Sequence, residues 1–342
     1  MLFLHIVLTL ICLFIIIVSC SFFTNAIEHL GKKLKWGSSA VGSVLAVIGT
    51  TLPETLVPII AIIGSKFFLN NSQIGEEIAF GGIIGSPFML VCLAMFLLGV
   101  ELLILRFFKK RDTLELKINH KTVLRDYKYF LSAYLIAISC LFFESKLIKI
   151  FAVLLLVTIY CFYIHRTILK SKLCFCEECV DELLIIQKFK KLEKYRDFLI
   201  ISQILFSLIV LSIAIHYFVC EIKHFSVLFN ISPIILSLII TPFATELPEC
   251  INSLIWVKNK KDDLALSNIN GAIIFQSIIP MSLGILLTPF VYDKTIALCA
   301  LFVIITTMIL MAIINFVKKI NCQTLLLCGI FYFLFICYLF LK

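Results

Sequence analysis

The stretch Gly49-Thr50-Thr51-Leu52-Pro53-Glu54 returns in related form as Ala244-Thr245-Glu246-Leu247-Pro248-Glu249. Leu-Pro-Glu therefore occurs twice, at an offset of 195 residues, and each copy lies near the middle of a long apolar segment (38–65 and 231–257). An ionisable side chain in the middle of a membrane costs several kcal/mol, so such residues mark candidate functional sites. The two stretches predict one site built from two copies of a motif.

A second pair of related stretches follows the first, at 79–86 and 265–272. Small or polar residues recur in both at a spacing of four, which allows helix backbones to approach closely in a membrane. The pairs are Gly81 with Gly85, Gly82 with Ser86, Ser267 with Gly271, and Asn268 with Ala272. The repeated unit is therefore a Pro-kinked helix that carries a glutamate, followed by a helix rich in small residues.

The composition is that of a protein that crosses the lipid bilayer many times. The 342 residues are 61% hydrophobic with a mean hydropathy of +1.10, well above the roughly 45–50% apolar content of soluble domains. The fold class that follows is an all-α polytopic membrane protein. The net charge of +9 lies in short loops between apolar spans, so we expect no nucleic-acid partner, and no obligate protein partner is evident.

The chain contains ten apolar spans that are long enough to cross a bilayer. We read the first as a retained helix rather than a signal peptide, because it lacks a basic leader and a clear cleavage site. The spans are 2–23, 38–65, 77–105, 127–143, 147–164, 198–219, 231–257, 264–287, 295–317 and 325–341.

The basic residues fix an orientation for these spans. Of the 30 Lys and Arg residues, 24 fall on the side of the loops that follow spans one, three, five, seven and nine. The positive-inside rule places that side in the cytoplasm and both termini outside it. We expect an integral, multi-pass protein of the cell (plasma) membrane.

The two motif pairs lie in spans two and three and again in spans seven and eight. Five spans separate equivalent helices, so the second half enters the membrane in the opposite direction, as in transporters with inverted repeats. The predicted organisation is a first five-helix half (1–166, with its repeat at about 42–98), a cytoplasmic connection (167–197) that contains a short amphipathic helix, and a second half (198–342, with its repeat at about 237–283).

Each motif offers a backbone oxygen at mid-membrane. Proline cannot donate a hydrogen bond to the carbonyl four residues earlier. Pro53 therefore releases the carbonyl of Gly49, and Pro248 releases the carbonyl of Ala244. Released carbonyls are tolerated at membrane depth where they line a cavity.

A hydroxyl accompanies each carboxylate. Thr50 lies four residues before Glu54, and Thr245 lies four residues before Glu249, so each hydroxyl shares a helix face with its carboxylate. Two carboxylates, two hydroxyls and two carbonyls form an anionic, all-oxygen cage. Hard cations take such ligands, and Ca²⁺ takes six to eight of them.

At these residues the sequence resembles the calcium:cation antiporter superfamily, which includes the sodium/calcium exchangers. Its repeats typically read Gly-Thr-Ser-Leu-Pro-Glu and then Gly-Asn-x-x-Gly-Ser-Asn, and the resemblance covers 42–98 and 237–283. It implies exchange of Ca²⁺ for Na⁺ or H⁺. It also implies metal-site roles for Glu54 and Glu249 as central ligands, for Thr50, Thr51 and Thr245 as hydroxyl partners, and for Ser86 and Asn268 as polar neighbours.

The sequence departs from this pattern at two positions, where it loses one amide and gains one carboxylate. Gly82 stands where the family has asparagine, and Glu246 stands where the second motif has serine. Glu246 lies three residues before Glu249 and so projects to nearly the same helix face. With Glu54 facing them, three carboxylates would share one pocket, and at least one would hold a proton when no cation is bound.

The predicted function is a secondary active antiporter that exchanges Ca²⁺ for Na⁺ or H⁺ by alternating access, with transported ions and no cofactor. The alternatives are an H⁺-coupled exchanger of another cation and, in a different class, an intramembrane enzyme. No paired nucleophile and base and no metalloprotease motif supports the enzyme. Cys174, Cys176 and Cys179 in the connecting loop are either a Zn²⁺ or Cu(I) site or spare reduced thiols.

Overall fold

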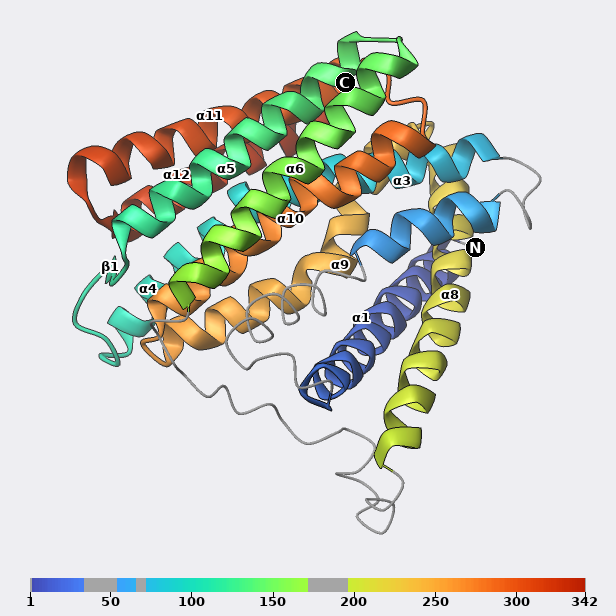
Figure 1. Cartoon of the computed structure of the whole chain (residues 1–342). Coiled ribbons are helices and arrows are strands. Elements are labelled where there is room, and N and C mark those ends of the chain that lie inside the picture. The colour runs from blue at the N-terminus through green and yellow to red at the C-terminus, as the bar shows by residue number, and fades with distance from the viewer. Residues whose placement is uncertain (1, 34–53, 66–71, 172–195, 342) are drawn as a thin grey trace. The chain divides into compact units, whose positions relative to one another are not determined.

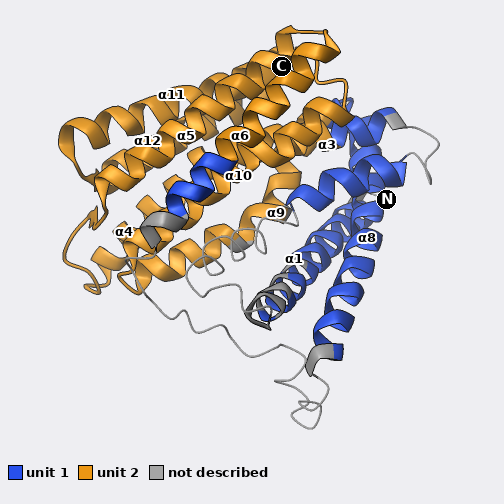
Figure 2. Cartoon of the chain, in the orientation of Figure 1, with its two compact units in different colours: residues 1–78, 161–233 blue, residues 79–160, 234–342 orange. Residues whose placement is uncertain are grey.

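The structure is a computed structural model that describes residues 2–33, 54–65, 72–171 and 196–341. The chain forms two compact units, one made of residues 1–78 and 161–233 and the other of residues 79–160 and 234–342 (Figure 2). Each unit draws on both halves that the repeats predict, so the predicted domain boundaries stay a prediction. The helix predicted in the connecting loop, and Cys174, Cys176 and Cys179, lie outside the described residues.

The first unit is built on a long antiparallel helix pair. Helix α1 (Leu2–Lys33) runs beside α8 (Arg196–Phe229), as Figure 1 shows. At one end of the pair, Gln203 Nε2 donates to Phe22 O at 2.8 Å and to Asn25 Oδ1 at 3.2 Å. This unit also holds the short apolar helix Glu54–Ser65. Both long helices extend beyond the apolar spans predicted for them, because each continues into a polar segment.

The second unit contains the remaining long helices. A continuous helical run consists of α3 (Ser72–Phe88), which begins in the first unit, then the π-helix η1 (Met89–Ala94) and α4 (Met95–Phe107). Pro87 lies inside α3 just before the change from α to π geometry. The other helices are α5 (His120–Ser139), which continues into the 3₁₀ turn η2 (Cys140–Phe142), α6 (Lys146–Ser171), which ends in the first unit, α9 (Pro233–Lys258), α10 (Asp262–Leu287), α11 (Lys294–Val317) and α12 (Cys322–Leu341).

Local sequence signals explain several helix ends. Asn119 caps α5 by accepting a hydrogen bond from Thr122 N at 3.4 Å, and Asp293 caps α11 by accepting from Thr295 N at 2.7 Å. Both side chains satisfy backbone donors that have no partner within the helix. Helix α9 begins at Pro233, whose fixed φ suits a first helical position.

The loops at one end of this unit are joined by polar contacts. Strand β1 (Glu115–Leu116) pairs antiparallel with β2 (Ile320–Asn321), and Cys322 N donates to Leu114 O at 2.8 Å. Arg111 binds Asp262, at the start of α10, through two hydrogen bonds of 2.7 and 2.5 Å. These contacts join the α4–α5 loop to α10 and to the α11–α12 connection.

The described residues contain seven helices that are long and apolar enough to cross a membrane, or eight if the bent helix α9 counts as one span. Glu54–Ser65 is apolar but shorter, and α5 is not among the seven because charged residues occupy its first turns. The all-α membrane fold is therefore confirmed. The count of ten spans stays a prediction.

Candidate cation site

The centre of the candidate site is a bend in α9. The helix divides into Pro233–Leu247 and Glu249–Lys258, and the two parts meet at 50°. Pro248 lies at the break, where the proline ring cannot donate to the carbonyl of Ala244. The kink predicted from Leu247-Pro248-Glu249 is therefore present.

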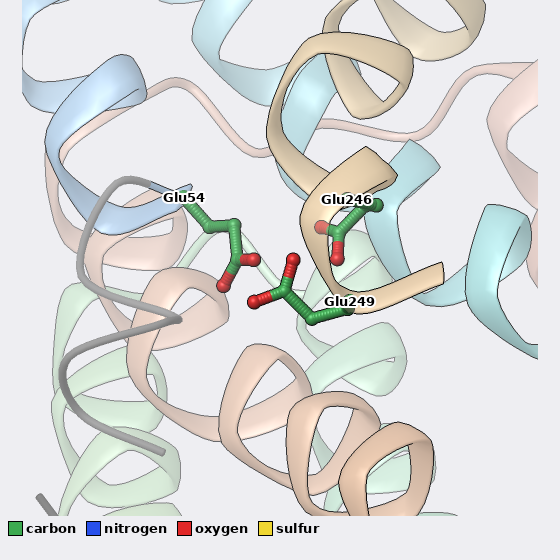
Figure 3. Close-up of side chains that lie close together, drawn as sticks. All are labelled: Glu54, Glu246 and Glu249. Atoms are coloured by element: carbon green, nitrogen blue, oxygen red, sulfur yellow. The ribbon is translucent and has the colours of Figure 1, made fainter. Parts of the chain in front are cut away.

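Two carboxylates come from this bend. Glu246 and Glu249 are 0% and 1% exposed, and each offers a carboxylate oxygen within 4.8 Å of the other's. Figure 3 shows both side chains leaving the α9 ribbon on the same side. The spacing of three residues places them there, as predicted, and two acids so close together attract cations.

Helix α10 holds these acids in place. Gln276 Nε2 donates to Glu246 Oε1 at 2.6 Å, and the Gln276 side chain is fully buried. Asn268 Nδ2 donates to the backbone oxygen of Glu249 at 3.3 Å and to Ser253 Oγ at 3.1 Å. One helix thus contacts both sides of the bend through neutral amides.

Helix α3 supports α9 from another direction through its glycines. A Cβ atom added at Gly81 would lie 2.0 Å from Ser237 Oγ, and one added at Gly85 would lie 2.0 Å from Leu238 O. Both distances are far below any real contact, so only glycine fits at either position. The close helix approach predicted from the small residues is present here, and Ser86 is buried beside it.

The first motif ends in Glu54, the residue at which the helix Glu54–Ser65 begins. Its side chain is 4% exposed. Glu54 belongs to the first unit and the α9 acids to the second. Gly49, Thr50 and Thr51 lie outside the described residues.

The remaining predicted residues of the second motif lie within α9. The Thr245 hydroxyl is buried and donates to Thr241 O at 3.4 Å. Ala244 lies in the turn before the bend. The proline four residues later has no N–H group to donate to its carbonyl. The repeated motifs give no role to Gln276. Its bond to Glu246 could not be predicted from the sequence, because residues 30 apart share no local pattern.

Known proteins resemble this chain in sequence family and in fold. The sequence matches the family described as "Sodium/calcium exchanger protein" over residues 4–169 and 199–342. Among solved structures, the crystal structure of an H⁺/Ca²⁺ exchanger, CAX, has a TM-score of 0.71 at 17% identity, covering 98% of this chain and 82% of that chain. The sodium-calcium exchanger NCX_Mj has a TM-score of 0.58 at 17% identity, covering 98% and 99%. A search of curated proteins found no match.

Buried acids on a kinked, apolar helix are typical of ion-transport sites in helical membrane proteins. The matched regions cover nearly the whole sequence. The chain is a member of the sodium/calcium exchanger family, and the resemblance noted from its motifs is confirmed. Because the members of this family are transporters, the enzyme alternative is set aside.

Proposed function

We propose that this chain is a secondary active antiporter that exchanges Ca²⁺ for Na⁺ or H⁺ by alternating access. The observation that carries the proposal is the pair of buried carboxylates, Glu246 and Glu249, on the bend of α9. Two anionic oxygens at one point of an apolar helix are costly unless a cation offsets their charge. The two similar structures are those of an H⁺/Ca²⁺ exchanger and a sodium-calcium exchanger, which supports the choice of ion.

Glu54 completes the site in this proposal. It ends the first Leu-Pro-Glu motif as Glu249 ends the second, and it is buried although it is ionisable. An inverted repeat brings equivalent helices to one point at mid-membrane. The two Leu-Pro-Glu glutamates then supply two negative charges, which match the charge of Ca²⁺.

Neutral oxygens fill the other coordination positions. We assign them to the hydroxyls of Thr50, Thr51, Thr245 and Ser86, the carbonyls of Gly49 and Ala244, and the side-chain oxygen of Asn268. The described contacts support the last assignment, since Asn268 donates through Nδ2 to the backbone oxygen of Glu249 and so lies beside one of the two acids. An oxygen set of this size suits Ca²⁺, which takes six to eight ligands, better than Mg²⁺, which keeps its own water.

Glu246 gives the site a charge that Ca²⁺ alone does not balance. We propose that this third carboxylate carries a proton that leaves when Ca²⁺ enters. The bond from Gln276 fixes the position of Glu246 and stabilises its ionised form once the proton has left. Transport then depends on pH whether Na⁺ or H⁺ provides the driving gradient.

The membrane arrangement is part of the proposal. Ten spans result if Glu54–Ser65 and α5 are counted with the eight apolar spans, and the two five-helix halves are then inverted repeats. The protein lies in the cell membrane, and both of its termini are on the side opposite the cytoplasm, as the distribution of Lys and Arg predicts. Labelling a single cysteine at position 188 in intact cells tests this, because labelling from outside would contradict it.

Ion flux in proteoliposomes tests the function. Purified full-length protein is reconstituted, and uptake of ⁴⁵Ca²⁺ is followed with an outward Na⁺ gradient, an outward H⁺ gradient, or neither. We expect uptake that requires at least one of the two gradients. Uptake that is equal in all three conditions would indicate a channel, and no uptake with either gradient would exclude Ca²⁺ exchange.

A further inference from the structure

Three helices of the second unit are followed by a lysine in a strained conformation. Lys109, Lys260 and Lys318 come one or two residues after the ends of α4, α9 and α11, and their φ angles are 54°, 61° and 58°. Glycine adopts such positive φ angles at the end of a helix without strain, whereas a lysine does not. Strained residues of this kind cluster at sites of function, so the three lysines mark a candidate binding surface.

Contacts between loops bring the three helix ends to one end of the unit, the end at which Figure 1 labels β1. Arg111, two residues after Lys109, donates to Val257 O in the last turn of α9 at 3.4 Å. Strand β1, in the segment after α4, pairs with β2, which begins two residues after Lys318. The lysines that follow α4, α9 and α11 therefore belong to one surface.

This surface is strongly positive. The segments 106–128, 258–263 and 317–321 contain 13 Lys and Arg residues but five Asp and Glu residues. Three of the acids already bind a basic residue, in the pairs Arg111–Asp262, Arg125–Asp126 and Lys319–Glu115. Six exposed lysines, which we call the basic surface, have no acidic partner among the described residues: Lys109, Lys110, Lys258, Lys260, Lys261 and Lys318.

The basic surface borders the apolar faces of the helices. Phe107 and Phe316 lie at the ends of two candidate membrane spans and are 82% and 83% exposed, and Phe108 is 63% exposed. In a membrane protein such rings face lipid, and lysines at helix ends extend their ammonium groups toward the headgroups. An anion held by these lysines would therefore lie at the level of the lipid phosphates.

We propose that the basic surface binds the headgroups of anionic phospholipids. Basic clusters beside transmembrane helices attract anionic lipids, and each lysine near the membrane strengthens binding by about fivefold. The general excess of Lys and Arg on one side of the membrane explains why lysines occur in these loops, but it does not require three of them to occupy strained positions. The proposal depends neither on Ca²⁺ transport nor on which side faces the cytoplasm.

Binding is measured on purified full-length protein in detergent by native mass spectrometry, which counts bound lipids. Phosphatidylglycerol and phosphatidylcholine with the same acyl chains are compared at equal concentrations and at two concentrations of ammonium acetate. We expect phosphatidylglycerol to bind more tightly, and its advantage to shrink as the salt concentration rises, because salt screens exposed charges.

The decisive variant combines Lys109→Gly, Lys260→Gly and Lys318→Gly. It removes three charges and places glycine at each positive φ, so the unfolding temperature should not fall. We expect its affinity for phosphatidylglycerol to fall at least about tenfold, with little change for phosphatidylcholine.

The matched control combines Lys146→Gln, Lys223→Gln and Lys294→Gln. It removes the same number of charges outside the basic surface, and Lys294 begins α11, the helix that Lys318 follows. We expect phosphatidylglycerol binding to be retained in this control.

Three results would overturn the proposal. Unchanged phosphatidylglycerol binding in the glycine variant, or an equal loss in the control, would show that the basic surface is not the binding site. Equal binding of the two lipids by the unaltered protein would favour an acidic protein segment as the partner. Displacement of phosphatidylglycerol by millimolar inorganic phosphate would assign the lysines to a soluble anion instead.

Discussion

Helices α9 and α10 contain two kinds of buried acid, and the difference between them separates structure from function. Asp262, at the start of α10, is 2% exposed and accepts two hydrogen bonds from the guanidinium of Arg111 and one from Lys117 N at 2.7 Å. Glu246, on the bend of α9, is 0% exposed and accepts from the neutral amide of Gln276. The sequence has no Lys, Arg or His in 231–257 or 264–287. The protein supplies its own cation to Asp262, whereas in the proposed function the acids at the bend bind the transported cation.

Neutralising the acids of the proposed transport site should have the largest effect. Glu249→Gln and Glu54→Gln each remove a negative ligand from a site that must bind a divalent ion, so we expect Ca²⁺ flux in proteoliposomes to fall to background. Thermal stability in detergent should stay near that of the unaltered protein, because fewer like charges repel one another.

Glu101→Gln is the control for this prediction. It makes the same change in α4, inside an apolar helix and outside the proposed site, and should leave flux unchanged. Flux at the normal rate in both Glu249→Gln and Glu54→Gln would show that neither acid binds the transported ion, and the contrast with Asp262 would fail.

Breaking the ion pair between Arg111 and Asp262 should lower the stability of the protein, unlike the loss of an acid at the proposed transport site. Arg111→Met leaves the carboxylate of Asp262 buried without its guanidinium, and the loss of one partner from a buried pair costs about 3–5 kcal/mol of stability. We expect a lower unfolding temperature, measured in detergent micelles.

The double variant Arg111→Met with Asp262→Leu sharpens this test. It removes both charges and should recover much of the lost stability, since replacing a whole buried pair by apolar groups is often neutral. If Arg111→Met unfolds at the same temperature as the unaltered protein, the pair is not structural.

The contact between α3 and α9 provides an intermediate test. Gly85→Ala places a methyl group 2.0 Å from Leu238 O, so the helices must separate, and overpacking of this kind costs about 1–3 kcal/mol. Gly64→Ala is the matched control, because nothing lies within 4 Å of its added Cβ. We expect a lower unfolding temperature and slower Ca²⁺ flux for Gly85→Ala and no loss of stability for Gly64→Ala.

The sequence predicts the features of this site that depend on local chemistry. Pro248 dictates the bend of α9, the spacing of Glu246 and Glu249 dictates their common face, and Gly81 and Gly85 dictate a close helix contact. Each follows from geometry within a few residues, so a single sequence is enough.

The sequence does not predict contacts between distant segments. Asp262 reads as an acid that favours a helix N-terminus, and it does lie in the first turn of α10, but its main partner Arg111 is 151 residues away. The contact of His5 with Glu221, separated by 216 residues, leaves no local pattern either. Such pairs depend on which helices pack together, and apolar helices of similar composition do not reveal that choice.

The smallest expected effect concerns the proton at Glu246. Serine at this position restores the residue typical of the family and leaves the two acids that balance Ca²⁺, so Ca²⁺ flux should persist. If the proposed proton at Glu246 competes with Ca²⁺, flux of the unaltered protein should rise with pH until the acids of the site are ionised. For Glu246→Ser the rise should be shallower. Ca²⁺ flux is measured for both proteins against external pH from about 5.5 to 8.5, the range in which a group that carries protons during transport must titrate.

Gln276→Leu gives the converse change, because Glu246 loses the donor that stabilises its ionised form. The pH profile of Ca²⁺ flux for this variant should move toward higher pH. Coincident profiles for the unaltered protein and Glu246→Ser would mean that Glu246 carries no proton during transport, and that the bond from Gln276 serves only to hold α9 against α10.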